Sequence, residues 1–537
     1  MRTRQYVILT LLLVWALPLF ASANSHCCKE ELLEALSENP EIVNVEELGA
    51  LYHQKRYTIL WNRTDLDALL ALSEDPKYNY LQLPLHTAPL RQMRARMALE
   101  PLDPASRAKL DLLASDQFIS FAKFLYEGEI DAKRFFEIVQ EYGEKGLVWE
   151  PNPRKPHYLS DLKKALRTHR IQSILTRYPP AEKAFRALVE AYHRYRTMRF
   201  PKIDYLKDLK RGDYGYEVAQ LKHYLHVTGD LAESDPKYLD FPTFDEKLEQ
   251  AVLRFQKRHY LKQNGIFDRV NVLYARRSAQ DKAALIHLNI ERYKLFPRIV
   301  NDTHVIINIP GFILQFFEDG TLMDEIPVVI GREDRPTPIF RDVLEYIVLN
   351  PSWSIPQNLM KKDYIPHLAE DPASLLRDDI HIYRGGKEID PEKVDWSKYL
   401  NYEGRIPYRM VQKAGEKNVL GAMKFIFPNR YHVYLHDTNA KKLTTLRYRL
   451  YSSGCIRLAE PYKLLALLSP YTRYSYDRLL DIIASGKTAH IRLKRKVPIH
   501  IRYLTAFVDG AGRINFRKDF YGYDAIQMPL LNRSSMR

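Results

Sequence analysis

The change of pattern near residue 300 constrains the fold more than any other feature of this 537-residue chain. Before it, apolar residues recur at helical spacing, as in Leu159, Leu162 and Leu166. After it come short β-branched or aromatic runs bounded by Gly, Pro, Asn or Asp, such as Val305 to Ile309. A chain of this length is too long for a single core. We therefore predict a multidomain protein with a helical N-terminal scaffold, a small helical domain and a β-rich domain.

The N-terminus has the pattern of a secretory signal peptide. Arg2 and Arg4 precede an apolar run from Val7 to Leu17, and Ala21-Ser22-Ala23 supplies a small-x-small cleavage site. The run is shorter than the ~20 residues that cross a bilayer, and no later segment of the sequence is long and apolar enough to do so. We predict cleavage after Ala23 and an exported chain without a transmembrane span.

The exported chain is basic and poor in cysteine. Loss of Arg2 and Arg4 lowers the formal charge from +15 to +13, and in an exported protein this charge favours anionic lipid or wall polymer over nucleic acid. Cys27 and Cys28 are adjacent near the new N-terminus, which is no disulfide framework. The third cysteine, Cys455, has no obvious partner in an oxidising compartment, so a chemical use explains it better.

Composition and turn signals divide the chain into segments. The predicted segments are residues 1–23 (signal peptide), 24–200 (helical scaffold), 201–280 (small helical domain), 281–300 (a helix), 301–485 (β-rich domain) and 486–537 (C-terminal strands and a tail packed on the scaffold or on the β-rich domain). In the small domain, Thr243 to Glu246 has the pattern of a capping box. Residues 361–425 are charged, irregular and placed between two strand groups, which predicts an insertion that caps a site.

The stretch Ser452-Ser453-Gly454-Cys455-Ile456-Arg457 places a cysteine behind a turn of small residues. A cysteine nucleophile needs exposure, a base within reach and backbone N–H groups that hold an oxyanion, and a Ser-Ser-Gly approach leaves the backbone bare. A free cysteine is more often a buried core residue, but these Gly and Arg flanks are not an apolar run. We predict that Cys455 is a nucleophile, with the N–H groups of Gly454 and Cys455 as oxyanion donors.

His436 is the predicted base for this thiol. In the run from His432 to His436, strand alternation puts Val433 and Leu435 on one face and His432, Tyr434 and His436 on the other. A thiol of ordinary pKa is only a few per cent ionised at neutral pH, so it needs a base or positive surroundings. Arg457 adds positive charge or binds a substrate carboxylate. A helix predicted from Pro461, with its N-terminus toward the thiol, would add to that charge.

These residues describe acyl transfer through a thioester. A structural zinc site needs four ligands, and no CxxC or HxxxH motif accompanies Cys455, His436 and His432. The sequence also gives little support for a redox role, because Cys455 has no CxxC partner. We therefore expect no metal and no cofactor.

The sequence resembles L,D-transpeptidases of the YkuD type, whose motif is a His, a spacer and then Ser/Thr-x-Gly-Cys. Residues 437–451 form the spacer between His436 and Ser452. Further matches to that catalytic domain are Gly331 to Phe340, Asn350 to Pro356 and Gly421 to Asn429. The resemblance covers most of the mature chain and is closest to the large periplasmic members. In them a peptidoglycan-binding domain corresponds to 201–280 and a connector helix to 281–300.

The resemblance implies a role for each candidate site residue. Cys455 would be the nucleophile and His436 the general base and acid. Ser453 and Gly454 would line the oxyanion region, and Tyr434 and Arg457 would shape the donor site. Two departures from the family pattern are Ser453, where many relatives have His, and Leu458-Ala459-Glu460, where many carry Asn.

The resemblance also implies a reaction on peptidoglycan in the periplasm. Cys455 would attack the carbonyl of a meso-diaminopimelate residue in a tetrapeptide stem, release D-alanine and pass the acyl group to an amine of a second stem, forming a diaminopimelate-to-diaminopimelate crosslink. Its partners would be stem peptides, glycan and other cell-wall synthases, and carbapenems would inhibit it covalently. Water as acceptor would make it an L,D-carboxypeptidase. Two different functions also fit these residues, namely a wall-binding scaffold with an idle cysteine and a thiol hydrolase of another peptide.

Overall fold

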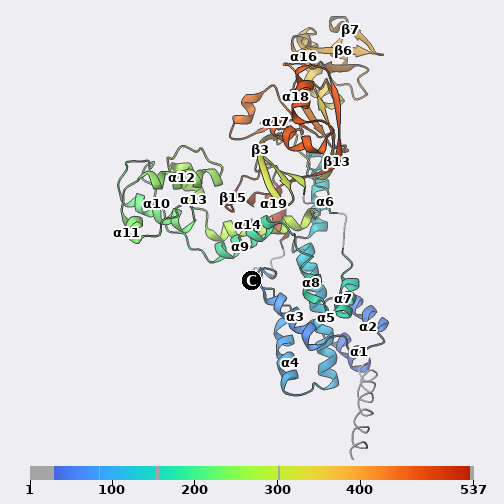
Figure 1. The fold of residues 1–537 in the computed structure, drawn as a ribbon, viewed down its shortest axis with the longest axis vertical. Coiled ribbons are helices and arrows are strands. Elements are labelled where there is room, and N and C mark those ends of the chain that lie inside the picture. The colour runs from blue at the N-terminus through green and yellow to red at the C-terminus, as the bar shows by residue number, and fades with distance from the viewer. Residues whose placement is uncertain (1–28, 84, 153–155, 300–302, 532–537) are drawn as a thin grey trace, which may run out of the picture.

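The computed structural model describes residues 29–83, 85–152, 156–299 and 303–531. The predicted signal peptide, Cys27 and Cys28 lie outside them. The predicted fold class is confirmed: Figure 1 shows N-terminal helices at the bottom, a helical arm at one side, and a β-sheet above with a cap over it. No helix within these described ranges is both long and apolar enough to cross a membrane.

The N-terminal helices pack around the long helix α5 (Pro104–Glu127). Asp103 caps its start by accepting from the N–H of Ser106 at 2.9 Å, and most side chains from Ala108 to Leu125 are buried. Its buried acids are hydrogen-bonded, since Asp111 accepts from the N–H of Trp61 at 2.8 Å. The other scaffold helices are α1 (Lys29–Glu38), α2 (Val45–Gln54), α3 (Arg63–Glu74), α4 (Thr87–Leu99), α6 (Ala132–Glu141), α7 (Tyr158–Thr168), α8 (Ile171–Leu175) and α9 (Lys183–Thr197).

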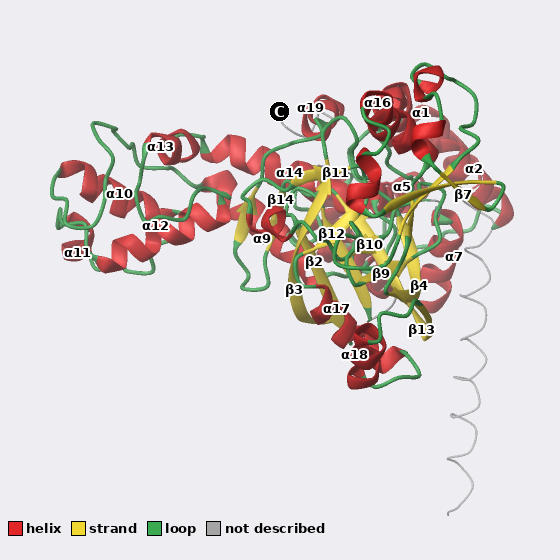
Figure 2. Cartoon of the chain, turned by 90° about the horizontal axis from the view of Figure 1, so that it is seen from above, coloured by secondary structure: helices red, strands yellow, loops and turns green. Residues whose placement is uncertain are grey.

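The small helical domain forms an arm with a hydrophobic core of its own. Its helices are α10 (Tyr216–Val227), α11 (Pro236–Asp240), α12 (Glu246–Arg258) and α13 (Arg269–Ala275). Figure 2 shows the arm projecting from the body of the molecule. The predicted capping box is wrong by two residues, because Asp245 caps α12 by accepting from the N–H of Leu248 at 2.9 Å.

Helix α14 (Ala279–Leu295) corresponds to the helix predicted at 281–300 and is buried between the scaffold and the sheet. Its charged residues are paired inside the protein. Glu291 accepts from Lys294 Nζ at 3.1 Å, and Arg292 pairs with Asp524 at 2.6 Å. In a sequence, charges at this density are typical of a solvent-exposed helix face. Because α14 contributes to both sides, the scaffold and the sheet share one continuous hydrophobic core.

The β-rich domain is built on a nine-stranded sheet in the order β11-β3-β12-β10-β9-β4-β13-β1-β2, and β2 also pairs with β3. Its strands are β1 (His304–Asn308), β2 (Ile313–Glu318), β3 (Thr321–Gly331), β4 (Arg341–Leu349), β9 (Met423–Ile426), β10 (Leu435–His436), β11 (Leu450–Ser452), β12 (Ile456–Leu458) and β13 (Ala489–Arg502). The β2–β3 pairing closes the hydrogen-bonded strands into a ring. Helices α17 (Pro461–Leu468) and α18 (Tyr476–Ala484) follow β12.

The sheet extends beyond the predicted limit at residue 485. Strand β13 lies between β4 and β1, so it is a central strand of the sheet and not a separate layer. It pairs antiparallel with β4 and parallel with β1. The chain then ends in β14 (Ala506–Val508), β15 (Ile514–Phe516) and α19 (Tyr523–Gln527).

The cap is a small unit with its own core. Its sheet has the order β5-β8-β6-β7. Its elements are β5 (Trp353–Ser354), α15 (Gln357–Leu359), α16 (Ile365–Glu370), β6 (Ile380–Arg384), β7 (Lys387–Ile389) and β8 (Arg409–Gln412). The predicted limits 361–425 are therefore shifted: the cap starts at Trp353, and β9, from Met423, already belongs to the main sheet.

Candidate active site

A hydrogen-bonded turn between β11 and β12, the nucleophile turn (residues 452–455), presents the predicted nucleophile Cys455. The Oγ of Ser452 donates to the carbonyl of Cys455 and accepts from the N–H of Gly454 at 3.2 Å. Gly454 has φ +108°, a conformation that favours glycine. The prediction of two oxyanion donors is corrected here, because the Gly454 N–H is already used within the turn. The predicted role stays with the Cys455 N–H.

The strand register brings the four main candidate residues to one face of the sheet. Strands β10 and β12 are parallel, with Leu435 beside Ile456 and His436 beside Arg457. Leu435 and Ile456 are fully buried in the core, so Tyr434, His436, Cys455 and Arg457 belong to the opposite face. With ~3.3 Å of rise per residue and ~4.8 Å between strands, the Cα atoms of diagonal neighbours such as Cys455 and His436 are about 8 Å apart. Their side chains can bridge that separation.

His436 is held as a neutral base. Its Nδ1 is hydrogen-bonded to the carbonyl oxygen of Asp437, and because a carbonyl only accepts, Nδ1 carries the proton and Nε2 is left as the acceptor. Burial lowers the pKa of His436 to about 3, and the nearby positive charge of Arg457 adds to the effect. The imidazole is therefore uncharged at neutral pH and able to take a proton.

The surroundings of Cys455 favour the protonated thiol. Burial raises its pKa above the ordinary value, while hydrogen bonds from Tyr434 and the positive charges of Arg457 and Lys424 oppose that rise. The Sγ atom lies 3.8 Å from the carbonyl oxygen of His432. The site thus pairs a thiol with a neutral histidine, and attack by sulfur requires transfer of the thiol proton.

Arg457 has hydrogen-bonding capacity to spare. Its Nε is buried and, among the residues that the structure describes, finds no hydrogen-bond partner. Burial lowers its pKa, and the neighbouring Cys455 and Tyr364 oppose this. A buried guanidinium with an unused donor is suited to bind a carboxylate.

Three further residues of the site escaped the sequence interpretation. Lys424 pairs with His436 across β9 and β10, and its Nζ lies 5.6 Å from the ring centre of Tyr434. Arg335 donates to both carboxylate oxygens of Asp363, at 2.6 and 2.7 Å, and to Ser453 Oγ at 3.1 Å. Alternation in Met423-Lys424-Phe425 could have revealed Lys424. No local sequence pattern could have predicted the Arg335–Asp363 pair, because its two residues come from separate segments and join the cap to the nucleophile turn.

Two sequence predictions around the site are wrong in their geometry. The strand predicted from His432 to His436 is confined to Leu435–His436, because His432 has φ +55° and lies in a turn. Its side chain therefore does not follow the predicted alternation. Helix α17 begins at Pro461 as expected, but β12 lies between it and Cys455. Since a helix dipole acts within about one turn, Arg457 and Lys424 are the positive groups that act on the thiol.

Comparison with known proteins identifies the parts of the chain. Residues 302–475 match the L,D-transpeptidase catalytic domain (YkuD), residues 46–191 a scaffold domain, and residues 214–270 a "Putative peptidoglycan binding domain". The chain is 32% identical over 238 residues to a "Putative L,D-transpeptidase" of Haemophilus influenzae. That match covers 44% of this chain and 47% of the relative, so the chain spans about half the length of the curated protein it matches.

Solved structures of L,D-transpeptidases are also similar to parts of the chain. One is an L,D-transpeptidase from Mycobacterium smegmatis, with 13% identity and a TM-score of 0.18 over 37% of this chain and 58% of that one. Another is the Ldtfm–avibactam carbamoyl enzyme, with 12% identity and a TM-score of 0.17 over 42% of this chain and 63% of that one.

The match of the β-rich part defines the class it is similar to, namely catalytic domains of the YkuD type. More particularly, residues 302–475 match an L,D-transpeptidase catalytic domain and residues 214–270 match a peptidoglycan-binding domain, which bears out the resemblance noted in the sequence.

Proposed function

We propose that this chain is a periplasmic L,D-transpeptidase that crosslinks peptidoglycan stems through a cysteine thioester. The observation that carries the proposal is the placement of Cys455 on the same sheet face as a neutral His436, whose Nε2 is free to accept because Nδ1 is bonded to Asp437. The catalytic-domain and peptidoglycan-binding matches support the substrate class.

The proposed reaction has two half-steps. The Nε2 of His436 takes the proton of Cys455, and the sulfur attacks the diaminopimelate carbonyl of a tetrapeptide donor stem. The Cys455 N–H stabilises the oxyanion, and His436 returns the proton to the leaving amine of D-alanine. An amine of the second stem then attacks the thioester and loses its proton to His436, which passes that proton to the departing sulfur of Cys455. This forms the new amide and restores the thiol.

Arg457 is the proposed ligand for a donor carboxylate. Its unused Nε donor lies on the strand next to His436, and a bidentate guanidinium–carboxylate contact would orient the stem. Tyr434 packs against both the cap core and His436, with ring centres 5.6 Å apart. It would therefore form part of the donor wall.

The contacts between cap and site favour an amine acceptor over water. The Arg335–Asp363 ion pair and Tyr434 hold the cap against the nucleophile turn, and a cap in that position would limit the access of water to a thioester on the half-buried Cys455. An L,D-carboxypeptidase would instead need a site that admits water freely.

Incubating the purified protein with sacculi and separating the resulting muropeptides tests the proposal. We expect new diaminopimelate-to-diaminopimelate crosslinks, and none with the Cys455→Ala variant. Tripeptide stems without crosslinks would establish the carboxypeptidase instead, and unchanged stems would leave only wall binding. In parallel, a carbapenem should label the wild-type protein covalently. Labelling that persists in Cys455→Ala would refute the role of Cys455.

A further inference from the structure

Tyr521 is connected to the nucleophile turn by a series of hydrogen bonds that uses its own hydroxyl and the hydroxyl of Thr337. Tyr521, which precedes α19, donates from its hydroxyl to the carbonyl of Gly331 at 2.7 Å and accepts from the N–H of Thr337 at 3.2 Å. The Thr337 hydroxyl accepts from the N–H of Gly331 at 2.9 Å and donates to the carbonyl of Gly454 at 2.9 Å. This series of bonds links Tyr521, through Thr337, to the residue that precedes Cys455.

The loop between Gly331 and Thr337 is packed too tightly to be positioned by side-chain bulk. A Cβ on Gly331 would lie 2.3 Å from the carbonyl oxygen of Arg335 and 2.7 Å from the nitrogen of Thr337. Thr337 is 1% exposed and Tyr521 is 7% exposed. Hydrogen bonds therefore define where this loop sits, and the Tyr521 hydroxyl makes two of them.

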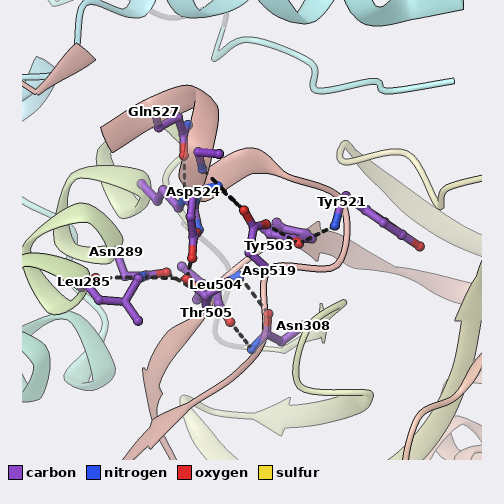
Figure 3. A network of polar contacts seen from close by, with 12 residues as sticks. Leu285, Asn289, Asn308, Tyr503, Leu504, Thr505, Asp519, Tyr521, Asp524 and Gln527 are labelled. Carbon is purple, nitrogen blue, oxygen red and sulfur yellow. Dashed lines mark hydrogen bonds and ion pairs between the residues drawn. The ribbon is translucent and has the colours of Figure 1, made fainter. Parts of the chain in front are cut away.

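Tyr521 is itself held by the network drawn in Figure 3. Its N–H donates to the Tyr503 hydroxyl at 2.9 Å, and that hydroxyl donates to Asp519 at 2.7 Å. The other oxygen of Asp519 accepts from the N–H of Asp524 at 2.8 Å, and Asp524 pairs with Arg292 of α14. The rings of Tyr503 and Tyr521 are stacked, with centroids 5.6 Å apart. Tyr521 is therefore held in place by hydrogen bonds and an ion pair that extend to Arg292 of α14.

The bond to the Gly454 carbonyl has a direct consequence for the nucleophile. The carbonyl of Gly454 and the N–H of Cys455 belong to the same planar trans peptide, so they point in opposite directions. When Thr337 fixes the carbonyl, it also fixes the direction of the Cys455 N–H. That N–H is the oxyanion donor in the proposed reaction.

We propose that Tyr521 is a positioning residue for acyl transfer, which acts through Thr337 and the Gly454–Cys455 peptide to aim the oxyanion donor. Tyr521 lies outside the segment 302–475 that matches the catalytic domain, and no step of the reaction uses it directly. The inference rests on the proposed function, because an aimed N–H matters only when the thiol attacks a carbonyl.

Two reactions of the same thiol separate this role from a purely structural one. Acylation by a carbapenem creates an oxyanion, whereas alkylation by iodoacetamide creates none. For Tyr521→Phe we expect the second-order rate constant of acylation to fall about tenfold, the effect of a displaced but not deleted oxyanion donor, and alkylation to stay within about twofold. Thr337→Val should behave alike, while Thr337→Ser, which keeps the hydroxyl, should restore acylation.

A matched control and a double variant complete the test. Tyr523→Phe removes an equivalent hydroxyl, which donates to the carbonyl of Val148 at 3.3 Å, and should leave both reactions unchanged. Because Tyr521 and Thr337 act in series, the Tyr521→Phe/Thr337→Val double variant should lose no more acylation than the more damaging single variant. If Tyr521→Phe does not fold, the Thr337→Val and Thr337→Ser comparison carries the test.

Three results would overturn the inference. They are unchanged acylation in Tyr521→Phe, an equal fall in acylation and alkylation, and an equal loss in Tyr523→Phe. A wild-type protein that is alkylated at Cys455 but never acylated would instead overturn the proposed function, so the two failures are distinguishable.

Discussion

The resting charge state of Cys455 and His436 leads to a prediction about pH. The pKa of His436 is about 3 and burial raises that of the thiol. Both shifts oppose transfer of the thiol proton to the imidazole in the resting protein, because each disfavours the charged form of its group. Less than about 3% of the thiol is ionised at pH 7. The resting protein should therefore show no stable thiolate–imidazolium ion pair.

The assay is the rate of iodoacetamide alkylation as a function of pH, with Cys455→Ala as the background. Since only thiolate reacts, the rate should rise log-linearly, by about 300-fold from pH 6.0 to 8.5, without a plateau. His436→Asn should change this profile by less than about threefold. It should nevertheless lower carbapenem acylation at least about 100-fold, because the base acts only during attack.

A plateau in the wild-type alkylation rate between pH 6 and 8 that disappears in His436→Asn would refute this reasoning. It would show that the histidine already holds the proton before substrate arrives.

Two further predictions concern the buried charges of α14. Lys294→Met leaves the fully buried Glu291 without its cation and should cost about 3–5 kcal/mol of unfolding free energy, whereas adding Glu291→Gln should recover part of the loss in urea unfolding. A double variant that loses the sum of both single effects would contradict the pairing. Burial lowers the pKa of His287 to about 4, so its contribution to stability is full above about pH 6.5 and is lost as the pH falls toward 4, about 2 kcal/mol of it by pH 5. His287→Asn should shrink the fall in unfolding free energy between pH 8 and pH 5 by that amount, and an unchanged fall would count against it.

Local sequence signals predicted individual helices and strands, though not always their limits, and they did not predict which strands pair in the sheet. The β-branched run from Val305 to Ile309 corresponds to β1. The proximity of Cys455 and His436 depends on β12 lying between β3 and β10, against the order of the chain, and such long-range pairing leaves no periodic signal. For the same reason the ion pair of Arg335 with Asp363 could not be predicted.

The burial of charged side chains also could not be predicted from the sequence. Helix α14 carries Glu291, Arg292 and Lys294, which a sequence pattern assigns to a solvated face. Each has a partner from a distant segment: the N–H of Glu129 for Glu291, Asp524 for Arg292, and Tyr80 and the carbonyl of Phe124 for Lys294. A single left-handed residue, His432, likewise interrupted an alternation that otherwise fitted a strand.

The antiparallel bridge between Ile130 and Leu531 returns the end of the described chain to the scaffold. The N–H of Asp131 donates to the carbonyl of Leu530 at 3.3 Å across this bridge. A polypeptide is synthesised from its N-terminus, and N-terminal domains generally fold first. Leu530 and Leu531 therefore reach their scaffold partners after nearly all of the preceding chain has emerged. The order of synthesis thus delays assembly of the complete fold until the C-terminal segment arrives.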